Sequence, residues 1–320
     1  MASLISVALA TCNGTRYLPA LLESISVQRL PPSEIVAYDD ASEDGTVALL
    51  KSFAADAPFP VRIHRNPTRL GVVENFSRAI AACSGDCFAL ADQDDVWHVD
   101  KLAHLSNALA KPSALAAFSD ANVVAWNLDR LGYTMWQRVH FSQHEQRRMA
   151  QGNGFEVLLK HHVVTGATLA GKTSLRDAAL PIPPGWPHDA WLALVAAAQE
   201  GLIAIGEPLI DYRQHADNIV GGKRRTIWRE AAVALALDRA AFYRAEIGCW
   251  RALEERLSSL PGATAALPSL SEKITHLETR ASLPAARWRR LPGVWRELTA
   301  GRYIRYARNW GSIAIDLLVR

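Results

Sequence analysis

Three aspartates follow directly on a short apolar segment, and this junction constrains the fold more than any other part of the sequence. Residues 87–91 are apolar, a pattern typical of a buried parallel strand. Asp92, Asp94 and Asp95 come immediately after them. Ligands of open α/β sheets bind at the carboxyl ends of the strands, where these carboxylates would lie. Because neighbouring carboxylates repel one another, they favour a hard divalent cation, Mg²⁺ or Mn²⁺, which also binds phosphate.

The same acids have a simpler explanation. An aspartate before a helix can cap the first turn and interact favourably with the positive end of the helix dipole. A helix is expected to start near Val96, so capping would explain one acid in this position. It does not explain an Asp-X-Asp-Asp segment directly after a buried strand. We therefore favour the metal site, which would also bind a diphosphate.

Alternating apolar and helical segments predict the fold class. Apolar residues at helical spacing mark the helices, turn residues such as Asn13-Gly14 separate the elements, and Thr15 is a candidate cap for the first helix. This alternation is typical of an α/β protein with a mostly parallel, doubly wound sheet flanked by helices. The expected strands are 4–10, 34–38, 61–64, 87–91, 114–119, 161–170, 202–205 and 209–212; helices are expected between Thr15 and Pro31 and at 46–54, 72–83, 95–111 and 188–198, with a hairpin or irregular insert at 121–150.

Composition limits the class of function. The chain has 320 residues, 49% of them hydrophobic, and a net charge of +3, so it lacks the overall basic character of a nucleic-acid-binding protein. Its four cysteines have neither zinc-site nor disulfide-framework spacing. The first residues do not form a signal peptide, and no apolar stretch approaches the roughly 20 residues of a membrane span. We therefore expect a cytoplasmic protein that binds no nucleic acid.

Acids also follow two other expected strands. Asp39 and Asp40 end the strand at 34–38, and Asp120 follows the strand at 114–119. Turn or helix capping explains such residues when they occur singly. Together with the acids at 92–95 they predict one ligand site at the edge of the sheet. If the ligand is a nucleotide, Asp39 or Asp40 could accept a hydrogen bond from its base or ribose.

Two segments in the second half of the chain contain further candidate site residues. Residues 188–191, His-Asp-Ala-Trp, open a strongly apolar helix. Asp189 is placed either to cap that helix or to accept a proton in a cleft, and the local sequence does not distinguish the two. His188 beside it is more typical of a structural histidine. His215, in the polar segment 213–222, is more typical of a surface loop when taken alone.

Residues 166–173, Gly-Ala-Thr-Leu-Ala-Gly-Lys-Thr, match the spacing of a phosphate-binding P-loop. Such a loop needs a strand before it and a substantial helix after it, whereas Pro181 limits any following helix to about two turns. Asp211 is a poor candidate for the magnesium-binding acid that should end a later strand. We therefore expect a strand and loop that line the other half of the site, with Lys172 exposed.

The composition changes after about residue 223, where the chain becomes rich in Ala, Leu and Arg and helical in pattern. From residue 287 onward arginines alternate with Trp and Tyr. This end of the chain suits an anionic membrane surface, where each Arg or Lys contributes about 1 kcal/mol and Trp and Tyr prefer the interface. It equally suits a helical appendage whose Trp residues pack on the preceding domain or on a second subunit. The sequence leaves both interpretations open.

Five segments in order resemble the family 2 glycosyltransferases of the GT-A fold. They are residues 5–18, 38–46, 91–97, 188–193 and 212–221, and the last two are similar to the bacterial branch that includes rhamnosyltransferases for surface polysaccharide. The resemblance covers about residues 4–222 and, more faintly, the helical tail. The chain departs from the family at Cys12, where an aromatic residue is frequent, and this puts little in doubt.

The resemblance implies transfer of a sugar, with inversion, from a nucleotide-sugar to a hydroxyl. Cofactor and partners would be a divalent cation, a dTDP-rhamnose or UDP-sugar donor, and a saccharide or lipid-linked saccharide acceptor. The implied roles are nucleoside binding for Asp40 and Asp39, with Thr11 and Asn13 lining that pocket; metal and diphosphate binding for Asp94, Asp92 and His215; a position close to the donor sugar for Asp95; general base for Asp189; and further substrate contacts for Asp120, His188 and Trp191.

The resulting prediction is a catalytic domain at 1–222, followed by a helical region at 223–320. The nucleotide-binding half would take about residues 1–112, and the acceptor half about 113–222. We expect an enzyme of O-antigen or capsule assembly, cytoplasmic or peripheral at the inner face of the plasma membrane, with a second copy of the chain as a candidate partner. The alternatives are a P-loop-type nucleotide hydrolase and a non-catalytic nucleotide-sugar binder.

Overall fold

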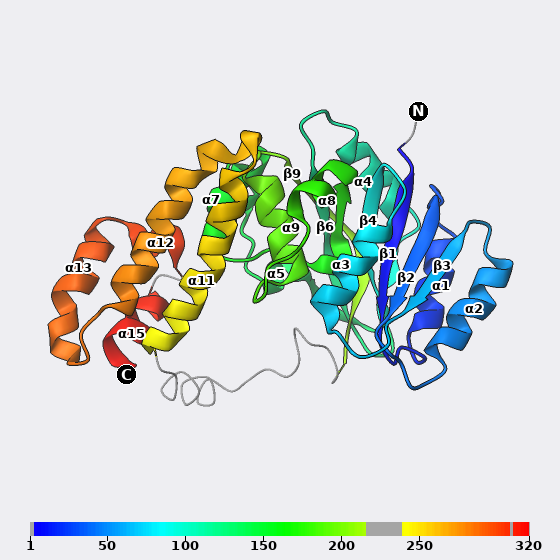
Figure 1. Cartoon of the computed structure of the whole chain (residues 1–320), viewed down its shortest axis with the longest axis horizontal. Coiled ribbons are helices and arrows are strands. Elements are labelled where there is room, and N and C mark those ends of the chain that lie inside the picture. Colours follow the sequence, from blue (N-terminus) through cyan, green and yellow to red (C-terminus); the bar gives the residue numbers. More distant parts are fainter. Residues whose placement is uncertain (1–2, 216–238, 308–309, 320) are drawn as a thin grey trace.

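The computed structural model describes residues 3–215, 239–307 and 310–319, and its described part is an α/β fold with a mostly parallel sheet flanked by helices, as predicted (Figure 1). The first half of the sheet is entirely parallel, in the order β3-β2-β1-β4. Its elements are β1 (Ile5–Thr11), α1 (Leu18–Ser26), β2 (Glu34–Asp39), α2 (Thr46–Asp56), β3 (Val61–Arg65), α3 (Val72–Ala82) and β4 (Cys87–Asp92).

An antiparallel strand joins this half to the rest of the sheet. Strand β8 pairs antiparallel with both β4 and β6, whereas β6 and β9 are parallel. The elements of this half are β5 (Val96–Trp97), α4 (Lys101–Leu109), β6 (Ala116–Ala125), β7 (Arg130–Thr134), α5 (Met135–Arg138), α6 (Gln143–Ala150), α7 (Gly154–Lys160), η1 (Gly166–Thr168), β8 (Leu169–Lys172), α8 (Thr173–Ala179), α9 (His188–Ala197) and β9 (Leu202–Gln214).

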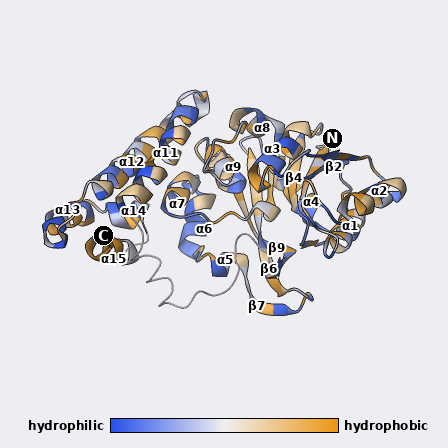
Figure 2. Cartoon of the chain, turned by 60° about the horizontal axis from the view of Figure 1, so that its bottom comes forward, coloured by the Kyte–Doolittle hydropathy of each residue, from blue (hydrophilic) through white to orange (hydrophobic). Residues whose placement is uncertain are grey.

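Hydrophobic residues cover both faces of the sheet, because successive side chains of a strand point to opposite sides. In β1, Val7 and Leu9 belong to the core beneath α1 and α4, and Ala8 and Ala10 to the core beneath α3 and α9. All seven residues of β1 are buried, as expected for a central parallel strand. Figure 2 shows the hydrophobic residues concentrated along these inner strands.

Several sequence-based boundaries were wrong. Thr15 does not cap the first helix, since α1 begins at Leu18 and the Thr15 hydroxyl donates to Asp44 instead. The helix expected from Val96 begins only at Lys101, because Val96–Trp97 pairs with β9 as the short strand β5. The expected strand at 161–170 is confined to Leu169–Lys172. The two strands expected at 202–205 and 209–212 are one irregular strand, β9.

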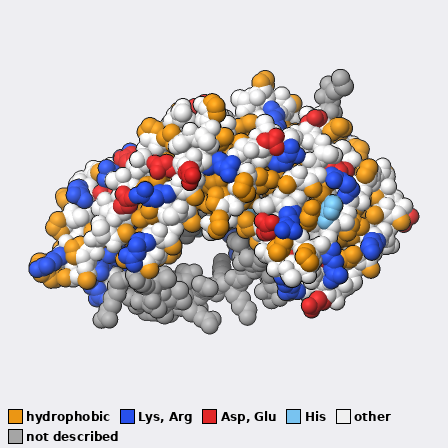
Figure 3. All heavy atoms as spheres, viewed as in Figure 1, with side chains coloured by type: hydrophobic (Ala, Val, Ile, Leu, Met, Phe, Trp, Pro, Cys, Tyr) orange, Lys and Arg blue, Asp and Glu red, His pale blue; other side chains and the backbone are white. Residues whose placement is uncertain are grey.

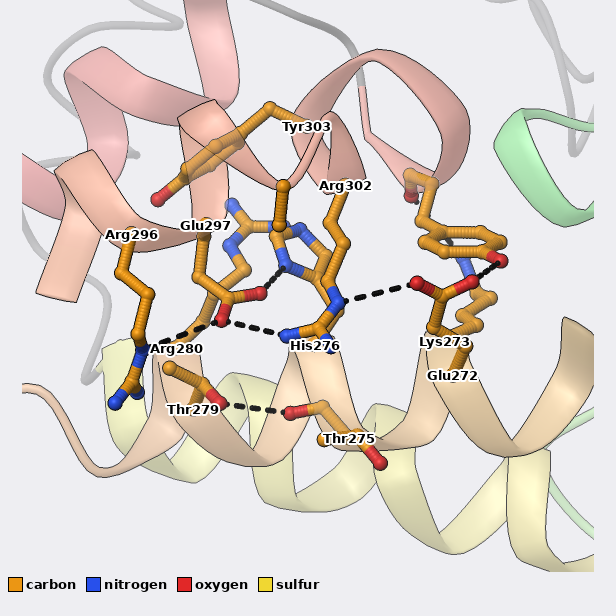
Figure 4. Close-up of polar contacts among 12 residues, drawn as sticks. Glu272, Lys273, Thr275, His276, Thr279, Arg280, Arg296, Glu297, Arg302 and Tyr303 are labelled. Carbon is orange, nitrogen blue, oxygen red and sulfur yellow. Dashed lines mark hydrogen bonds and ion pairs between the residues drawn. The ribbon is translucent and has the colours of Figure 1, made fainter.

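The C-terminal region is helical, as predicted, and packs against the preceding α/β part of the chain. Trp250 of α11 lies edge-on to Trp186, and the ammonium of Lys273 in α12 donates to the carbonyl of Leu159. Polar contacts also connect the helices to one another (Figure 4). The elements are α11 (Arg239–Ser258), η2 (Pro261–Ala266), α12 (Leu267–Ala281), η3 (Arg287–Arg290), α13 (Leu291–Thr299), α14 (Arg302–Tyr306) and α15 (Trp310–Leu318).

The predicted domain boundary at 222/223 lies outside the described residues. Helices α12 and α13 form the end of the molecule opposite β3 (Figure 1). Among the described residues, none of the helices combines the length and the apolar character needed to span a bilayer.

Candidate active site

The acidic turn after β4 is fixed to the loop that follows β1. The side chain of Gln93 accepts a hydrogen bond from the Cys12 amide (2.8 Å) and donates one to the Cys12 carbonyl (2.9 Å). Gly14 permits this approach, since a Cβ there would lie 2.3 Å from Gln93 Oε1. The Asp92–Asp95 turn is therefore held against the amino-terminal strand, at the carboxyl edge of the sheet.

Asp94 and His215 meet at this turn although 121 residues separate them. Asp94 Oδ2 lies 2.8 Å from His215 Nε2, and both side chains remain partly exposed, at 18% and 12%. The His215 ring stacks on Tyr17 with a centroid distance of 4.8 Å. Arg213 Nε donates to the Asp94 carbonyl (2.8 Å), which anchors the end of β9 to the turn. Two of the three predicted metal ligands, Asp94 and His215, therefore lie side by side.

Asp95 is fully buried beneath the turn and supports it. Its Oδ1 accepts the backbone N–H of Arg213 (3.1 Å), and its Oδ2 has no hydrogen-bond partner among the described residues. Burial, together with the charges of Asp94 and Asp92, raises the pKa of Asp95 well above its ordinary value. With no exposed surface, Asp95 positions the turn in this structure, and the predicted closeness to a donor sugar stays a prediction.

Lys101 is a fully buried cation below the acids. Its ammonium donates to the Ala167 carbonyl (2.7 Å) and lies 3.4 Å from the centre of the Trp97 ring. Burial lowers the pKa of Lys101 well below its ordinary value, although Asp95 and Asp92 act in the opposite sense. A lysine in this state compensates the carboxylates only weakly.

Asp92 is therefore surrounded mainly by other acids. Burial, the charge of Asp94 and the charge of Asp189 raise the pKa of Asp92 to about 7. Asp189, from the second half of the chain, therefore acts on the Asp92 carboxyl through its charge. A group of carboxylates in this condition is stabilised by an added cation.

Asp189 lies in the first turn of α9, as predicted, and its carboxylate bridges two elements. Oδ2 accepts the backbone N–H of Gly166 (3.1 Å) and lies 3.4 Å from His162 Nε2, while Oδ1 accepts the N–H of Ala190. Burial alone would raise the pKa of Asp189, but hydrogen bonding and charge from His162, with His188 and Ala190, lower it to about 2. Asp189 is therefore ionised at neutral pH and able to accept a proton.

The other two residues of this segment that were predicted to contact substrate, His188 and Trp191, have different surroundings. His188 is buried, stacks on Phe76 at 4.2 Å and has no hydrogen-bond partner for Nε2 among the described residues. The substrate contact predicted for Trp191 is wrong, because Trp191 is fully buried and its indole N–H donates to the Ala179 carbonyl (2.7 Å). Its large apolar ring belongs to the core beneath α9, since helical spacing directs it away from the Asp189 side.

The residues predicted to bind the nucleoside form the loops after β1 and β2. Asp40 accepts hydrogen bonds from Asn66 Nδ2 and the amides of Leu70 and Gly71; burial alone would raise its pKa, but these bonds lower it. Asp39 accepts the hydroxyls of Thr11 and Ser42.

Asn13, on the adjoining loop, adopts a left-handed backbone with φ of 50°, and its side chain accepts the Glu43 amide (2.9 Å). Thr11 and Asp39 are almost fully buried, so they shape these loops from beneath. Nucleoside binding by the four residues stays a prediction.

Asp120 does not end a strand, contrary to the sequence prediction. It lies in the middle of β6, where the register with β9 is irregular. One carboxylate oxygen accepts the N–H of Trp136 (2.9 Å) and that of Ala121 (2.8 Å). Asp120 therefore positions the start of α5, and it is nearly fully buried in doing so.

The P-loop-like segment is not a P-loop. Residues 169–172 form strand β8 instead of a loop. The amide of Lys172 donates to the Leu115 carbonyl (2.8 Å), and both the amide and the hydroxyl of Thr173 donate to the Asp86 carbonyl. A P-loop needs such amides free to surround a phosphate, so this segment cannot bind one in that way. A strand is present here, although it begins only at Leu169, and Lys172 is half-buried instead of exposed.

Sequence analysis missed four residues of this site: Gln93, Tyr17, Lys101 and His162. Gln93 lies inside the acidic motif and could have been noticed there, whereas the other three occupy ordinary helical, loop or strand-end positions. Among the described residues, no group of three or more His, Cys, Asp or Glu side chains converges in metal-binding geometry. Within that part of the chain, Asp94 and His215 are a pair of potential ligands in direct contact.

Known proteins share this sequence pattern. Residues 6–172 match the family model for glycosyl transferase family 2. The dTDP-rhamnosyl transferase RfbG of Shigella flexneri is 26% identical over 253 residues, covering 75% of this chain and 82% of that protein. The abequosyltransferase RfbV of Salmonella typhimurium is 34% identical over 108 residues, 33% of this chain. The chain spans 32% of the length of RfbV and 27% of the uncharacterized Rv1520 of Mycobacterium tuberculosis, at 32% identity over 93 residues.

Solved structures share the fold. Staphylococcus aureus TarS 1-349 in complex with UDP-GlcNAc has a TM-score of 0.56 at 14% identity, covering 93% of this chain and 81% of that chain. The mannosyltransferase PcManGT from Pyrobaculum calidifontis, in complex with GDP-Man and Mn²⁺, has a TM-score of 0.52 at 19% identity, covering 99% and 86%. At these identities the likeness concerns the fold alone.

Proposed function

Since the chain belongs to glycosyl transferase family 2 and has a GT-A fold, we propose that it is a metal-dependent, inverting enzyme that transfers a sugar from a nucleotide-sugar to a hydroxyl acceptor. The contact between Asp94 and His215 carries this proposal. It joins the turn after β4 to the end of β9, and the charge of the ionised Asp189 acts on Asp92 of the same turn. Three polar groups from distant parts of the chain thus surround one edge of the sheet, where α/β enzymes bind their substrates.

The residues present fit a divalent cation. Asp94 and His215 offer an oxygen and a nitrogen ligand from partly exposed side chains, and burial together with the charges of Asp94 and Asp189 raises the pKa of the neighbouring Asp92 carboxyl. Carboxylates suit Mg²⁺ and Mn²⁺, and an imidazole in the set favours Mn²⁺ over Mg²⁺, which prefers an all-oxygen octahedron. A bound cation would stabilise the charge that develops on the departing diphosphate.

Asp189 is the proposed general base. In a single displacement, the acceptor oxygen forms a bond to the anomeric carbon while the bond from that carbon to the diphosphate oxygen breaks, and the hydroxyl proton passes to Asp189. The carboxylate is ionised and is oriented by the Gly166 amide and His162. A positioned base of this kind contributes about 10²–10⁴-fold to a rate.

The relatives support a first choice of donor and acceptor. We propose dTDP-rhamnose as the first donor to test, because the chain covers 82% of a protein named dTDP-rhamnosyl transferase, and UDP-sugars as the second. The acceptor would be a saccharide or lipid-linked saccharide of surface polysaccharide assembly, met at the cytoplasmic side of the membrane. Asp40, with the loops that Asp39, Thr11 and Asn13 shape, would hold the nucleoside.

Donor binding is tested by thermal shift with dTDP-rhamnose, UDP-sugars and GDP-mannose, each with and without Mn²⁺. A ligand that binds only the folded protein at 100 times its Kd adds about 2.7 kcal/mol to its stability. We expect a Mn²⁺-dependent shift that Asp94→Ala abolishes. Glu207→Ala is the matched control, since it breaks a His–carboxylate pair of similar length, His104–Glu207 at 3.0 Å, outside the site. Equal shifts in wild type and Asp94→Ala would refute the metal-site assignment.

Catalysis is tested separately with the donor found in this way. Asp189→Asn should bind the donor with wild-type affinity and lose transfer by about 10²–10⁴-fold, because shape is kept and the proton acceptor is lost. Asp177→Asn, at an exposed position, is the control. A donor that binds wild type with no sugar transferred to any offered acceptor would favour the non-catalytic binder. Full transfer by Asp189→Asn would remove Asp189 from the mechanism.

A further inference from the structure

The end of the molecule formed by η3 and α13 exposes large aromatic side chains. Trp288 is 69% exposed and Trp295 is 67% exposed, with Leu291 between them. Positions three and four apart lie on one face of a helix, so the three side chains form a continuous apolar stripe. Val294 and Tyr303 face inward, in a small core. The fold is therefore complete without burying the stripe, which excludes the interpretation that these two Trp residues pack on the catalytic half.

Arginines flank this stripe on the surface. Arg287, Arg289 and Arg296 are exposed, and the Arg289 guanidinium lies 4.9 Å from the Trp288 ring centre. Figure 3 shows Arg and hydrophobic side chains together at this end of the molecule. Arginine beside an exposed Trp provides both a charge for an anionic headgroup and a ring for the interfacial layer.

The acids of the same segment do not reach the surface. Residues 283–320 contain eight arginines and two side-chain carboxylates, Glu297 and Asp316. Glu297 is 1% exposed and bound to Arg302 and His276, and Asp316 is fully buried and bound to Arg280. Arg296 Nε lies 3.9 Å from Glu297, whose carboxylate is shared with Arg302 and His276, so the two acids offset the surface arginines only in part.

We propose that the surface formed by Arg287, Trp288, Arg289, Leu291, Trp295 and Arg296 binds an anionic lipid bilayer, with the stripe inserted at the headgroup level. The positive charge of this surface favours an anionic bilayer over a second copy of the chain as its binding partner. A second copy of the chain would bring the same excess of arginines to a symmetric interface, whereas an anionic bilayer attracts each of them and receives Trp side chains at its interface. This inference is independent of the proposed catalytic function.

The test is flotation of the full chain with vesicles of phosphatidylcholine alone and with phosphatidylglycerol added. We expect binding to the anionic vesicles only, weakened by salt. At about fivefold per arginine, Arg287→Gln/Arg289→Gln/Arg296→Gln should bind about 100-fold more weakly. The control Arg29→Gln/Arg78→Gln/Arg147→Gln removes the same charge from exposed positions of the catalytic half and should bind within a few-fold of wild type.

Trp288→Ala/Trp295→Ala separates insertion from simple attraction. It should also weaken binding, and the tryptophan fluorescence of wild type should shift to the blue on anionic vesicles. Circular dichroism verifies that each variant is folded, and the arginine variant keeps the test valid should the tryptophan variant unfold. Equal weakening by both arginine triples, or no binding to anionic vesicles, overturns the proposal. Self-association that the tryptophan variant abolishes, without vesicle binding, would assign the surface to a second copy instead.

Discussion

Two groups of buried carboxylates differ in their neighbours. At the carboxyl end of β4, Asp92 and Asp95 lie near Asp94, and the pKa values of Asp92 and Asp95 are raised by burial and by these like charges. In the C-terminal helices, Asp316 accepts hydrogen bonds from Arg280 (2.7 Å), Tyr243 (2.9 Å) and Tyr303 (2.7 Å). The first group has only the weak compensation of the buried Lys101, whereas the second has a directly bonded arginine.

Glu297 is another buried carboxylate that is compensated by groups of the C-terminal helices. Its carboxylate lies 2.7 Å from His276 Nδ1 and accepts a hydrogen bond from Arg302 (2.9 Å), as Figure 4 shows. Burial and nearby arginine charges lower the pKa of His276 to about 3, so the histidine is neutral and a hydrogen-bond partner. Such satisfied polar networks fix the packing of helices without requiring a ligand.

This difference in neighbouring charges separates buried carboxylates that stabilise the fold from those that are available to bind a ligand. A carboxylate that is paired with a cation or hydrogen-bond donors of the same chain can stay ionised in the folded protein without a ligand. Carboxylates that face one another are stabilised only when something positive arrives, which is the condition of a metal site before its metal binds. Substitutions in each group test whether the neighbouring charges decide the effect of each carboxylate on stability.

The largest effect is expected in the compensated group. Asp316→Ala leaves the Arg280 guanidinium buried without its carboxylate and removes the acceptor of two tyrosine hydroxyls. Breaking a buried ion pair in this way costs about 3–5 kcal/mol. We expect that loss in the free energy of unfolding, measured with urea. Glu278→Ala, which breaks the exposed pair with Arg251, should cost less than about 1 kcal/mol. Similar costs for both variants would show that burial is not decisive.

Glu34 is a compensated acid in the N-terminal α/β part of the chain. The state of a buried carboxylate therefore depends on its neighbouring groups and not on the part of the chain in which it lies. Burial alone would raise its pKa, but hydrogen bonds from Ser6, Ser84 and Arg62 lower it from 4.5 to about 2. A depressed pKa stabilises the folded state above pH 4.5, and the contribution is lost as the pH falls towards 2.

Glu34→Gln should therefore lower the free energy of unfolding at pH 7 by up to about 3 kcal/mol. The difference from wild type should narrow as the pH falls below 4.5. Urea unfolding at a series of pH values measures this. A difference that stays constant down to the acid limit would mean that the hydrogen bonds are lost for steric reasons and that charge is unimportant.

Removing a charge from the acids after β4 should have the opposite effect and raise the free energy of unfolding. A raised pKa means that ionised Asp92 opposes folding at pH 8, so Asp92→Asn should stabilise the ligand-free protein by about 2 kcal/mol. The gain should disappear near pH 4, where the carboxyl is protonated in the folded protein. Asp177→Asn, at an exposed carboxylate, should change stability by less than about 0.5 kcal/mol. Destabilisation by Asp92→Asn at pH 8 would contradict the like-charge interpretation.

Local sequence predicted the first half of the fold well because its elements are compact and strongly patterned. The parallel strands β1 to β4 and their helices were found near their observed positions. Boundaries failed where a tertiary contact outweighed the local pattern. Val96–Trp97 has the composition of a helix start, but its pairing with β9 makes it a strand. Pairing between segments more than 100 residues apart has no local signal.

The sequence likewise predicted some residues of the candidate site correctly and missed or misplaced others. The acids at the strand ends, Asp189 and His215 were identified by motif, and the structure brings Asp94 and His215 together. Asp120 and Trp191 were misassigned, because a motif position does not show which way a side chain points. Lys101 was missed because a lysine near a helix start is normally exposed. Only the coordinates show that Asp95 and Ala167 surround it.

The smallest effect is expected at Lys172, and it decides between two functions. In a P-loop this lysine would contact the phosphates, and its loss would abolish nucleotide binding. Here Lys172 ends strand β8, and its ammonium donates to the Lys111 carbonyl (3.1 Å) at the surface. Lys172→Ala should therefore change stability by less than about 0.5 kcal/mol and leave the donor-induced thermal shift at its wild-type value. If Lys172→Ala abolished that shift while Asp94→Ala preserved it, the nucleotide would bind at β8 and the acids after β4 would need another explanation.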